Sequence, residues 1–167
     1  MIRINGLLFF VGALFCFSLG CGAVETDTEG YFVSLKHDEV NLRTGPGTQF
    51  PIIWVYKQKN YPIEVVAEHE LWREVKDIDG TTGWMHQAML SSRRYALVKE
   101  EEKLKDKPSV LGHAVALVQS GTLGRIRECP KDLSYCFLEF KQDDISVKGW
   151  LDKAFFYGVS SGEEISD

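Results

Sequence analysis

The sequence predicts an all-β protein that contains two small barrels in tandem, preceded by an N-terminal export signal. From residue 31 onward, short segments rich in valine, isoleucine and aromatic residues are separated by glycine, proline, asparagine and aspartate, which is typical of strands joined by turns. No stretch of the first barrel shows a helical period. A weaker copy of the same pattern follows a charged run. Short, closely spaced strands favour a closed barrel, because closure removes open sheet edges.

The first residues predict the export signal. Arg3 gives a basic start, Leu7 to Leu19 are mostly apolar, and small residues end at Ala23, so we expect residues 1–23 to be cleaved. The apolar stretch is shorter than the roughly 20 residues of an ordinary membrane span, although a single-pass anchor stays open. A lipid anchor at Cys21 is a further alternative, because the preceding residues partly match a lipobox. We therefore expect a periplasmic or secreted protein.

Charge argues against nucleic acid as a partner. The chain has a formal net charge of −5 at pH 7, and loss of Arg3 with the signal makes it more acidic. Phosphate recognition needs a basic face, and no basic cluster is denser than Arg93-Arg94.

The first barrel is expected over residues 31–97, after a polar, acidic and disordered lead-in at 24–30. Residues 87–89 are expected to form one helical turn, because they lack β-branched side chains. Six strands are predicted: Tyr31–Leu35, Glu39–Arg43, Ile52–Lys57, Ile63–His69, Leu71–Asp77 and Thr82–His86.

A tight turn is predicted directly after the second of these strands. Gly45 and Gly47 permit positive φ, and Pro46 between them fixes its own φ. We assign these three residues a structural role.

Residues 98–109 are expected to be a charged linker. The run from Lys99 to Lys107 mixes both signs of charge around one apolar residue, a composition that we expect to stay solvated. A second, degenerate barrel is expected over 110–160, followed by a disordered tail at 161–167. This barrel is expected to lack the counterpart of the Gly45–Gly47 turn.

Three segments of the second barrel echo the first. Gly149-Trp150-Leu151 matches Gly83-Trp84-Met85, Cys136–Phe140 matches Trp72–Val75, and Ala114–Gly121 matches Pro51–Gln58.

Cys129 and Cys136 are the two cysteines that remain once the signal is removed. Cysteines of exported proteins usually pair, and the flanking segments read as the two strands of a hairpin, where disulfide distances are reachable. A bridge over so short a loop would add roughly 2 to 3 kcal/mol of stability. The alternative, a zinc site, needs two further ligands, so no metal is expected.

The strand Asn41-Leu42-Arg43, the Gly45-Pro46-Gly47 turn and the later Trp72 and Gly83-Trp84 together resemble the bacterial SH3-like domain family. The order of elements over residues 31–160 is similar to an exported tandem subgroup, whose second unit carries a cysteine pair and Gly-Trp. Two residues depart from that pattern. The family often has an aromatic residue in place of Arg73, and it commonly has tryptophan in place of Tyr135, directly before the second cysteine. The resemblance implies a binding module for peptidoglycan peptides or for an envelope protein, with no cofactor.

The sequence gives little support to an enzyme. The four histidines lack metal-ligand spacing, no nucleophile motif occurs, and we name no catalytic residue. A cysteine hydrolase remains the remote alternative and requires a free thiol. A secreted interaction protein that acts on an extracellular or host protein is the other alternative.

Arg43, Tyr56 and Trp72 are the predicted ligand-binding residues. Arg43 closes a strand and could bind a carboxylate, or pair internally with Glu39 or Asp79. Tyr56 and Trp72 lie beside predicted loops, where rigid aromatic rings supply contact area.

The other three tryptophans, Trp54, Trp84 and Trp150, are assigned to structure because each lies inside a strand pattern. We expect Trp84→Ala to unfold the first barrel, at a cost of roughly 3 to 5 kcal/mol.

Overall fold

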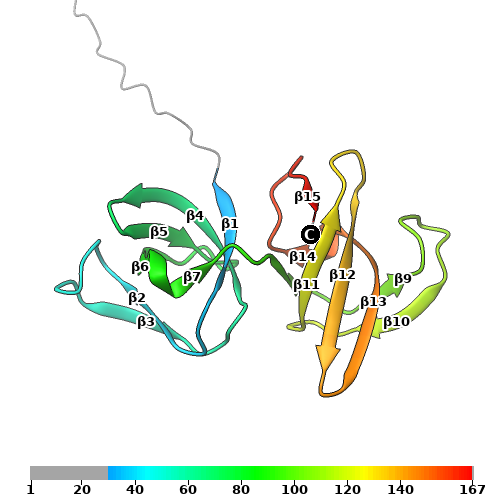
Figure 1. Cartoon of the computed structure of the whole chain (residues 1–167), viewed down its shortest axis with the longest axis horizontal. Helices are drawn as coiled ribbons and strands as arrows, with labels where there is room; N and C mark the ends of the chain where they lie inside the picture. Colours follow the sequence, from blue (N-terminus) through cyan, green and yellow to red (C-terminus); the bar gives the residue numbers. More distant parts are fainter. Residues whose placement is uncertain (1–29, 167) are drawn as a thin grey trace, which may run out of the picture.

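The computed structural model describes residues 30–166, so the expected signal and all but the last residue of the lead-in lie outside the described residues. The predicted all-β class is confirmed (Figure 1): the described chain forms two antiparallel sheets and two single-turn 3₁₀-helices. No helix within residues 30–166 is both long enough and apolar enough to cross a bilayer.

The first sheet has the spatial strand order β3-β2-β6-β5-β4-β1-β7. The predicted helical turn is η1 (Gln87–Met89), and the predicted strands agree with the observed ones to within one residue at each end. The strands are β1 (Tyr31–Leu35), β2 (Val40–Arg43), β3 (Ile52–Tyr56), β4 (Pro62–His69), β5 (Trp72–Lys76), β6 (Thr82–His86) and β7 (Leu90–Ser91).

The second sheet has the order β10-β9-β13-β12-β11-β8-β14, with β15 also paired to β11. Helix η2 (Lys153–Phe155) precedes β14, as η1 precedes β7. The strands are β8 (Tyr95–Val98), β9 (Glu102–Lys105), β10 (Ala114–Val118), β11 (Leu123–Cys129), β12 (Tyr135–Gln142), β13 (Ile145–Asp152), β14 (Phe156–Tyr157) and β15 (Ile165–Ser166). We call β1–β7 the first unit and β8–β15 the second unit.

The second unit repeats the first strand by strand, since β8 to β14 take the same places in their sheet as β1 to β7. Gly83 and Gly149 occupy the same place in the two units. A Cβ on Gly83 would lie 2.7 Å from Leu42, and a Cβ on Gly149 would lie 2.7 Å from Leu104. The expected echo of Gly83-Trp84-Met85 by Gly149-Trp150-Leu151 therefore has a structural basis.

Two expected echoes are wrong by a residue. Leu42 pairs with Trp54 and Leu104 pairs with Ala116, so Ala116 is the counterpart of Trp54, where the expected match of Ala114–Gly121 with Pro51–Gln58 placed Leu117. Val75 pairs with Gly83 and Leu138 pairs with Gly149, so Leu138 is the counterpart of Val75. The counterpart of Trp72 is then Tyr135, where the sequence comparison had placed Cys136.

The charged linker expected at 98–109 is wrong, because residues 102–105 form β9. In an extended strand alternate side chains face opposite sides, so a strand this short needs just one inward-facing apolar residue. Leu104 is that residue and has 0% exposure. β9 also supplies the counterpart of β2, with Leu104 and Lys105 in the places of Leu42 and Arg43.

Two domain boundaries also differ from expectation. β8 lies within the range assigned to the first barrel, yet it pairs with β11 and β14 of the second sheet. The tail expected to be disordered at 161–167 contributes β15, which pairs with the end of β11. Glu163 of this tail forms an ion pair with Arg94, which leads into β8.

Each unit has its own core, made by the inward-facing positions of its strands. The first core contains Leu35, Val40, Leu42, Tyr56, Ile63, Val65, Val75 and Met85. The second core contains Ala96, Val98, Leu104, Val118, Ile126, Cys129, Cys136, Leu138, Phe140, Leu151 and Phe156.

The predicted disulfide is present. Cys129 at the end of β11 is bonded to Cys136 in β12, across the hairpin that joins these strands. Both cysteines are fully buried in the second core.

The two units contact each other through β1, β5 and β14. The rings of Phe32 and Tyr157 lie 4.9 Å apart edge to face, and the Tyr157 hydroxyl donates to the Lys76 carbonyl oxygen at 3.0 Å. Burial is the main cause of the raised pKa of Tyr157, so the neutral phenol is favoured at this junction.

Candidate functional site

Arg43 stabilises the predicted turn through hydrogen bonds to the backbone of the residues that follow it. Its guanidinium donates to the carbonyl oxygens of Thr48 at 3.1 Å and Phe50 at 2.8 Å, so the expected pairing with Glu39 or Asp79 is wrong. Neither Gly45 nor Gly47 has a positive φ, so the reason expected for these glycines is wrong. Close packing favours glycine at position 45 instead, because a Cβ there would lie 2.6 Å from the Phe50 ring.

Trp72 and Trp84 lie on the outer face of the first sheet. The Trp72 ring packs against His86 at 5.4 Å, and the Trp84 ring packs against His69 at 6.4 Å. The buried position next to Trp84 belongs to Met85. The large stability loss expected for Trp84→Ala assumed that the Trp84 ring lies in the core. Trp84 is half-buried on the outer face, so this assumption does not hold. In the second unit, Trp150 likewise packs against Phe137 at 5.3 Å.

Tyr56 is buried, and its hydroxyl forms a hydrogen bond inside the protein. It donates to Oδ2 of Asp77 at 2.8 Å, while Oδ1 of Asp77 accepts from the backbone N–H groups of Asp79 at 3.0 Å and Thr81 at 2.7 Å. Burial is the main cause of the raised pKa of Tyr56, followed by the Asp77 hydrogen bond. Tyr56 therefore positions a buried carboxylate rather than offering a free ring.

These groups form the floor of a groove of about 360 Å³, which we call the aromatic–carboxylate groove. Trp54 stands at its edge with 57% exposure, and Tyr61 packs against Tyr56 at 5.6 Å between ring centres. Burial, with the charges of Asp77 and Asp79 adding to it, raises the pKa of Tyr61 to about 12. The lining comprises Trp54, Val55, Tyr56, Lys57, Gln58, Tyr61, Asp77, Asp79 and Thr81.

The groove combines aromatic rings with two carboxylates and has one cation, Lys57, in its lining. Aromatic faces attract cations, and carboxylates form charge-assisted hydrogen bonds with ammonium groups. This donor set suits an amine or guanidinium group on a ligand. Sequence reasoning identified Tyr56 alone among these residues.

Strand β3, which contributes residues to the groove lining, has an exposed apolar surface. β3 ends the strand order of its sheet, and Ile52, Ile53 and Val55 are exposed together with Trp54. Figure 1 shows the β2–β3 hairpin at one end of the molecule. Exposed apolar edge strands are sites where an extended peptide can add a strand.

The second unit has a groove of about 390 Å³ in the equivalent place, but with different chemistry. The strand registers place Ala116 where the first unit has Trp54, and Val118 where it has Tyr56. Phe140 takes the place of Asp77. Lys76 pairs with Thr82 as Glu139 pairs with Lys148, so Lys76 and Glu139 are equivalent, and Asp77 and Phe140 are the residues that follow them. The second groove has no carboxylate among its lining residues, so it cannot bind a cation in the same way.

We expect Tyr56→Phe to lower the free energy of unfolding by about 1 to 3 kcal/mol, because the buried Asp77 oxygen loses its donor. Urea denaturation measures this change. Tyr31→Phe is the matched control, since the exposed Tyr31 hydroxyl donates to Glu68 at the surface and should matter little. An equal loss in both variants would contradict the role of the Tyr56–Asp77 pair.

Within the part of the chain that the structure describes, no group of three or more histidine, cysteine, aspartate or glutamate side chains is arranged to hold a metal ion.

Residues 36–92 match the family model described as the bacterial SH3 domain. The match covers β2 to β7 and the whole lining of the aromatic–carboxylate groove, and it confirms the sequence resemblance for the first unit. None of the curated proteins matches the chain. Among solved structures, NlpC1 from Trichomonas vaginalis is similar at 13% identity with a TM-score of 0.34. The alignment covers 76% of this chain and 45% of that protein, so the chain spans less than half of its length.

Proposed function

We propose that this chain is an exported, non-catalytic binding protein whose first unit holds an amine-bearing peptide of the cell wall. The peptidoglycan stem peptide is the ligand we favour. One observation carries the proposal: Trp54, with 57% exposure, stands beside the Asp77 and Asp79 carboxylates in one groove.

The amine specificity follows from the charge and rigidity of the groove. Asp77 is held by three hydrogen bonds from Tyr56, Asp79 and Thr81, so its carboxylate keeps one orientation. Asp79 is exposed and adds a second negative charge at the rim. A ligand ammonium group near these carboxylates and the Trp54 ring would gain ionic and cation–π attraction together.

The extended shape of the ligand follows from β3. A peptide laid along this edge strand can form backbone hydrogen bonds, while its side chains contact Ile52 and Ile53. The bacterial SH3 domain match over residues 36–92 supports a binding role for the same unit.

An exported protein partner that presents a lysine in an extended segment has the same chemistry, and a murein-binding experiment separates the two. We expect the purified chain to sediment with intact insoluble murein and to stay in solution when the murein amines have been acetylated. Acetylation removes the positive charge and leaves the polymer otherwise intact.

Two outcomes would contradict the proposal. Equal retention on native and acetylated murein would mean that amines are not recognised. No retention on either would remove murein as the ligand and favour a protein partner. Fractionation of cells into periplasm, envelope and medium tests the export part of the proposal separately.

A further inference from the structure

The C-terminal segment, residues 158–166, contacts both units. Figure 1 shows it in red, on the side of the second unit that faces the first. In the second unit, β15 pairs with the end of β11, and Val159 and Ile165 pack against the core. Toward the first unit, the Ser160 hydroxyl donates to the carbonyl oxygen of Gly30, directly before β1, at 3.4 Å. The segment therefore bridges the junction between the units.

Arg94, which lies between β7 and β8, is bound by this segment. Its guanidinium forms a two-pronged ion pair with both carboxylate oxygens of Glu163 and donates to the Gly158 carbonyl oxygen at 2.7 Å. The Ser160 N–H donates to the same carboxylate at 3.1 Å and helps to orient it. The Arg94 and Glu163 side chains are 14% and 23% exposed, so salt screens their attraction only weakly. The guanidinium also lies 5.8 Å from the centre of the Phe32 ring in β1, so it joins the segment to the first unit.

Gly158 fits closely between the two units. Its φ is +128°, and a Cβ there would lie 2.4 Å from the Tyr95 carbonyl oxygen of β8 and 3.1 Å from Pro62 of β4. The preceding residue, Tyr157, packs its ring against Phe32 and donates its hydroxyl to the first unit, as described above. The start of the C-terminal segment is therefore held against the first unit as well as the second.

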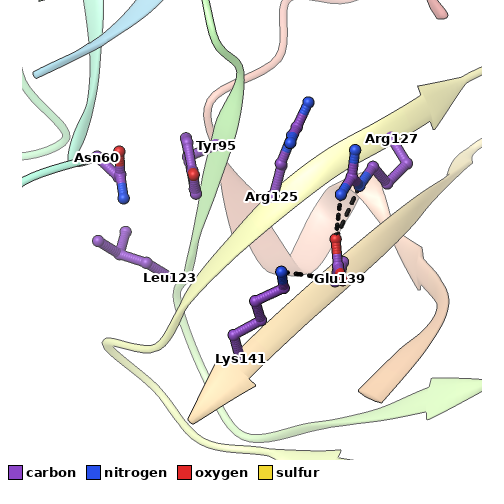
Figure 2. A pocket seen from close by; sticks show the side chains of 7 residues that line it. All are labelled: Asn60, Tyr95, Leu123, Arg125, Arg127, Glu139 and Lys141. Carbon is purple, nitrogen blue, oxygen red and sulfur yellow. Dashed lines mark hydrogen bonds and ion pairs between the residues drawn. The ribbon is translucent and has the colours of Figure 1, made fainter. Parts of the chain in front are cut away.

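Other parts of the junction are less well packed. A pocket of about 290 Å³, which we call the inter-unit pocket, separates Asn60 of the first unit from the second unit. Figure 2 shows Asn60 beside Tyr95 and Leu123 at this pocket, with the Arg127–Glu139 ion pair, which lies within the second unit, on its far side. Here the junction contains a cavity instead of interlocking side chains, so little packing would be lost if the units separated.

A buried hydroxyl in β1 also disfavours the closed junction. Strand alternation places Ser34 on the same side as Phe32, away from the first core, and Ser34 has 1% exposure. Within residues 30–166, its hydroxyl has no hydrogen-bond partner. A buried hydroxyl without a partner is unfavourable. Since this side of β1 faces Tyr157 of the second unit, separation of the units would let water reach it.

We propose that the C-terminal segment is a clasp: it keeps the two units in one relative orientation, and the junction opens as a hinge at residues 92–94 when the clasp is released. Two domains of one chain move relative to each other unless a large hydrophobic interface prevents it. This junction has a cavity and an unpaired hydroxyl, so the ion pair of Arg94 with Glu163 and the contacts of Tyr157 carry the restraint. The proposal does not depend on which ligand the first unit binds.

Residual dipolar couplings of the labelled full-length chain test the proposal, because they report the orientation of each unit. In the wild-type chain, we expect one alignment tensor to fit the backbone amides of both units. In a Tyr157→Ala/Glu163→Ala variant, we expect the two units to need different tensors and their amides to relax with shorter correlation times. Each unit's couplings should still fit its own fold, since neither side chain belongs to a core.

Glu164→Ala is the matched control. Glu164 is the neighbouring glutamate and is exposed, so its removal should leave a single tensor for both units. Separate tensors in the wild-type chain would show that nothing fixes the orientation, and a single tensor in the double variant would show that other contacts fix it. If Glu163→Ala alone unfolds the second unit, the segment serves the fold of that unit. Each of these results would overturn the clasp.

Discussion

Replacing Leu104 by alanine is expected to lower the free energy of unfolding by about 2 to 5 kcal/mol, the usual range for a buried leucine. The side chain has 0% exposure and packs beside Gly149, where a Cβ would already lie 2.7 Å away. Position 149 accepts no side chain larger than that of glycine. Since glycine has no side chain that could move, it cannot fill the cavity left by Leu104→Ala. A loss of this size is a large fraction of the stability of a small domain.

Urea denaturation of the two-unit chain measures the loss, with two comparisons. Leu42→Ala should behave alike, because Leu42 takes the same place beside Gly83 in the first unit. Leu111→Ala should change stability by less than about 0.5 kcal/mol, since Leu111 is 87% exposed. A Leu104→Ala variant as stable as Leu111→Ala would mean that residues 102–105 are a linker after all.

Replacing Trp54 by alanine is expected to weaken binding of the amine-bearing peptide by about 2 to 4 kcal/mol, a loss typical of a central aromatic contact. The ring provides most of the exposed aromatic surface beside Asp77 and Asp79. Because Trp54 is more than half exposed, the free energy of unfolding should change little. The substitution therefore separates binding from folding.

Trp84→Ala is the matched control for Trp54→Ala. Trp84 also lies on the surface of the first unit, but its ring packs against His69, away from the groove lining. Titration calorimetry with a soluble murein peptide should give unchanged affinity for this control. If Trp84→Ala loses as much affinity as Trp54→Ala, the ligand occupies the outer face of the sheet instead.

The strands, the Gly45–Gly47 turn and the disulfide could be predicted because their signals are local. Alternating apolar residues and turn-forming glycines act over a few positions, and Cys129 and Cys136 flank one hairpin. β9 could not be predicted in the same way. It has a single inward-facing leucine among charged residues, and its place in the sheet depends on pairing with β10 and β13, which lie further along the chain.

The candidate site was predicted less well, because it depends on which strands become neighbours. Tyr56 was identified from its position beside a loop, but the direction of its hydroxyl, toward Asp77, depends on the register between distant strands. Trp54 was assigned to structure because it lies within a strand pattern. β3 is an edge strand, however, and position on an edge cannot be deduced from the residues of the strand alone.

The most direct test of the account is to map amide shifts of the isotope-labelled chain during titration with a soluble, amine-bearing murein peptide. The account predicts saturable shifts at residues 54–58, 61 and 77–81 of the first unit. It also predicts none in the equivalent groove of the second unit, at residues 116–119 and 142–147, where Phe140 replaces Asp77. Shifts confined to the second groove, or no saturable shift in either groove, would contradict it.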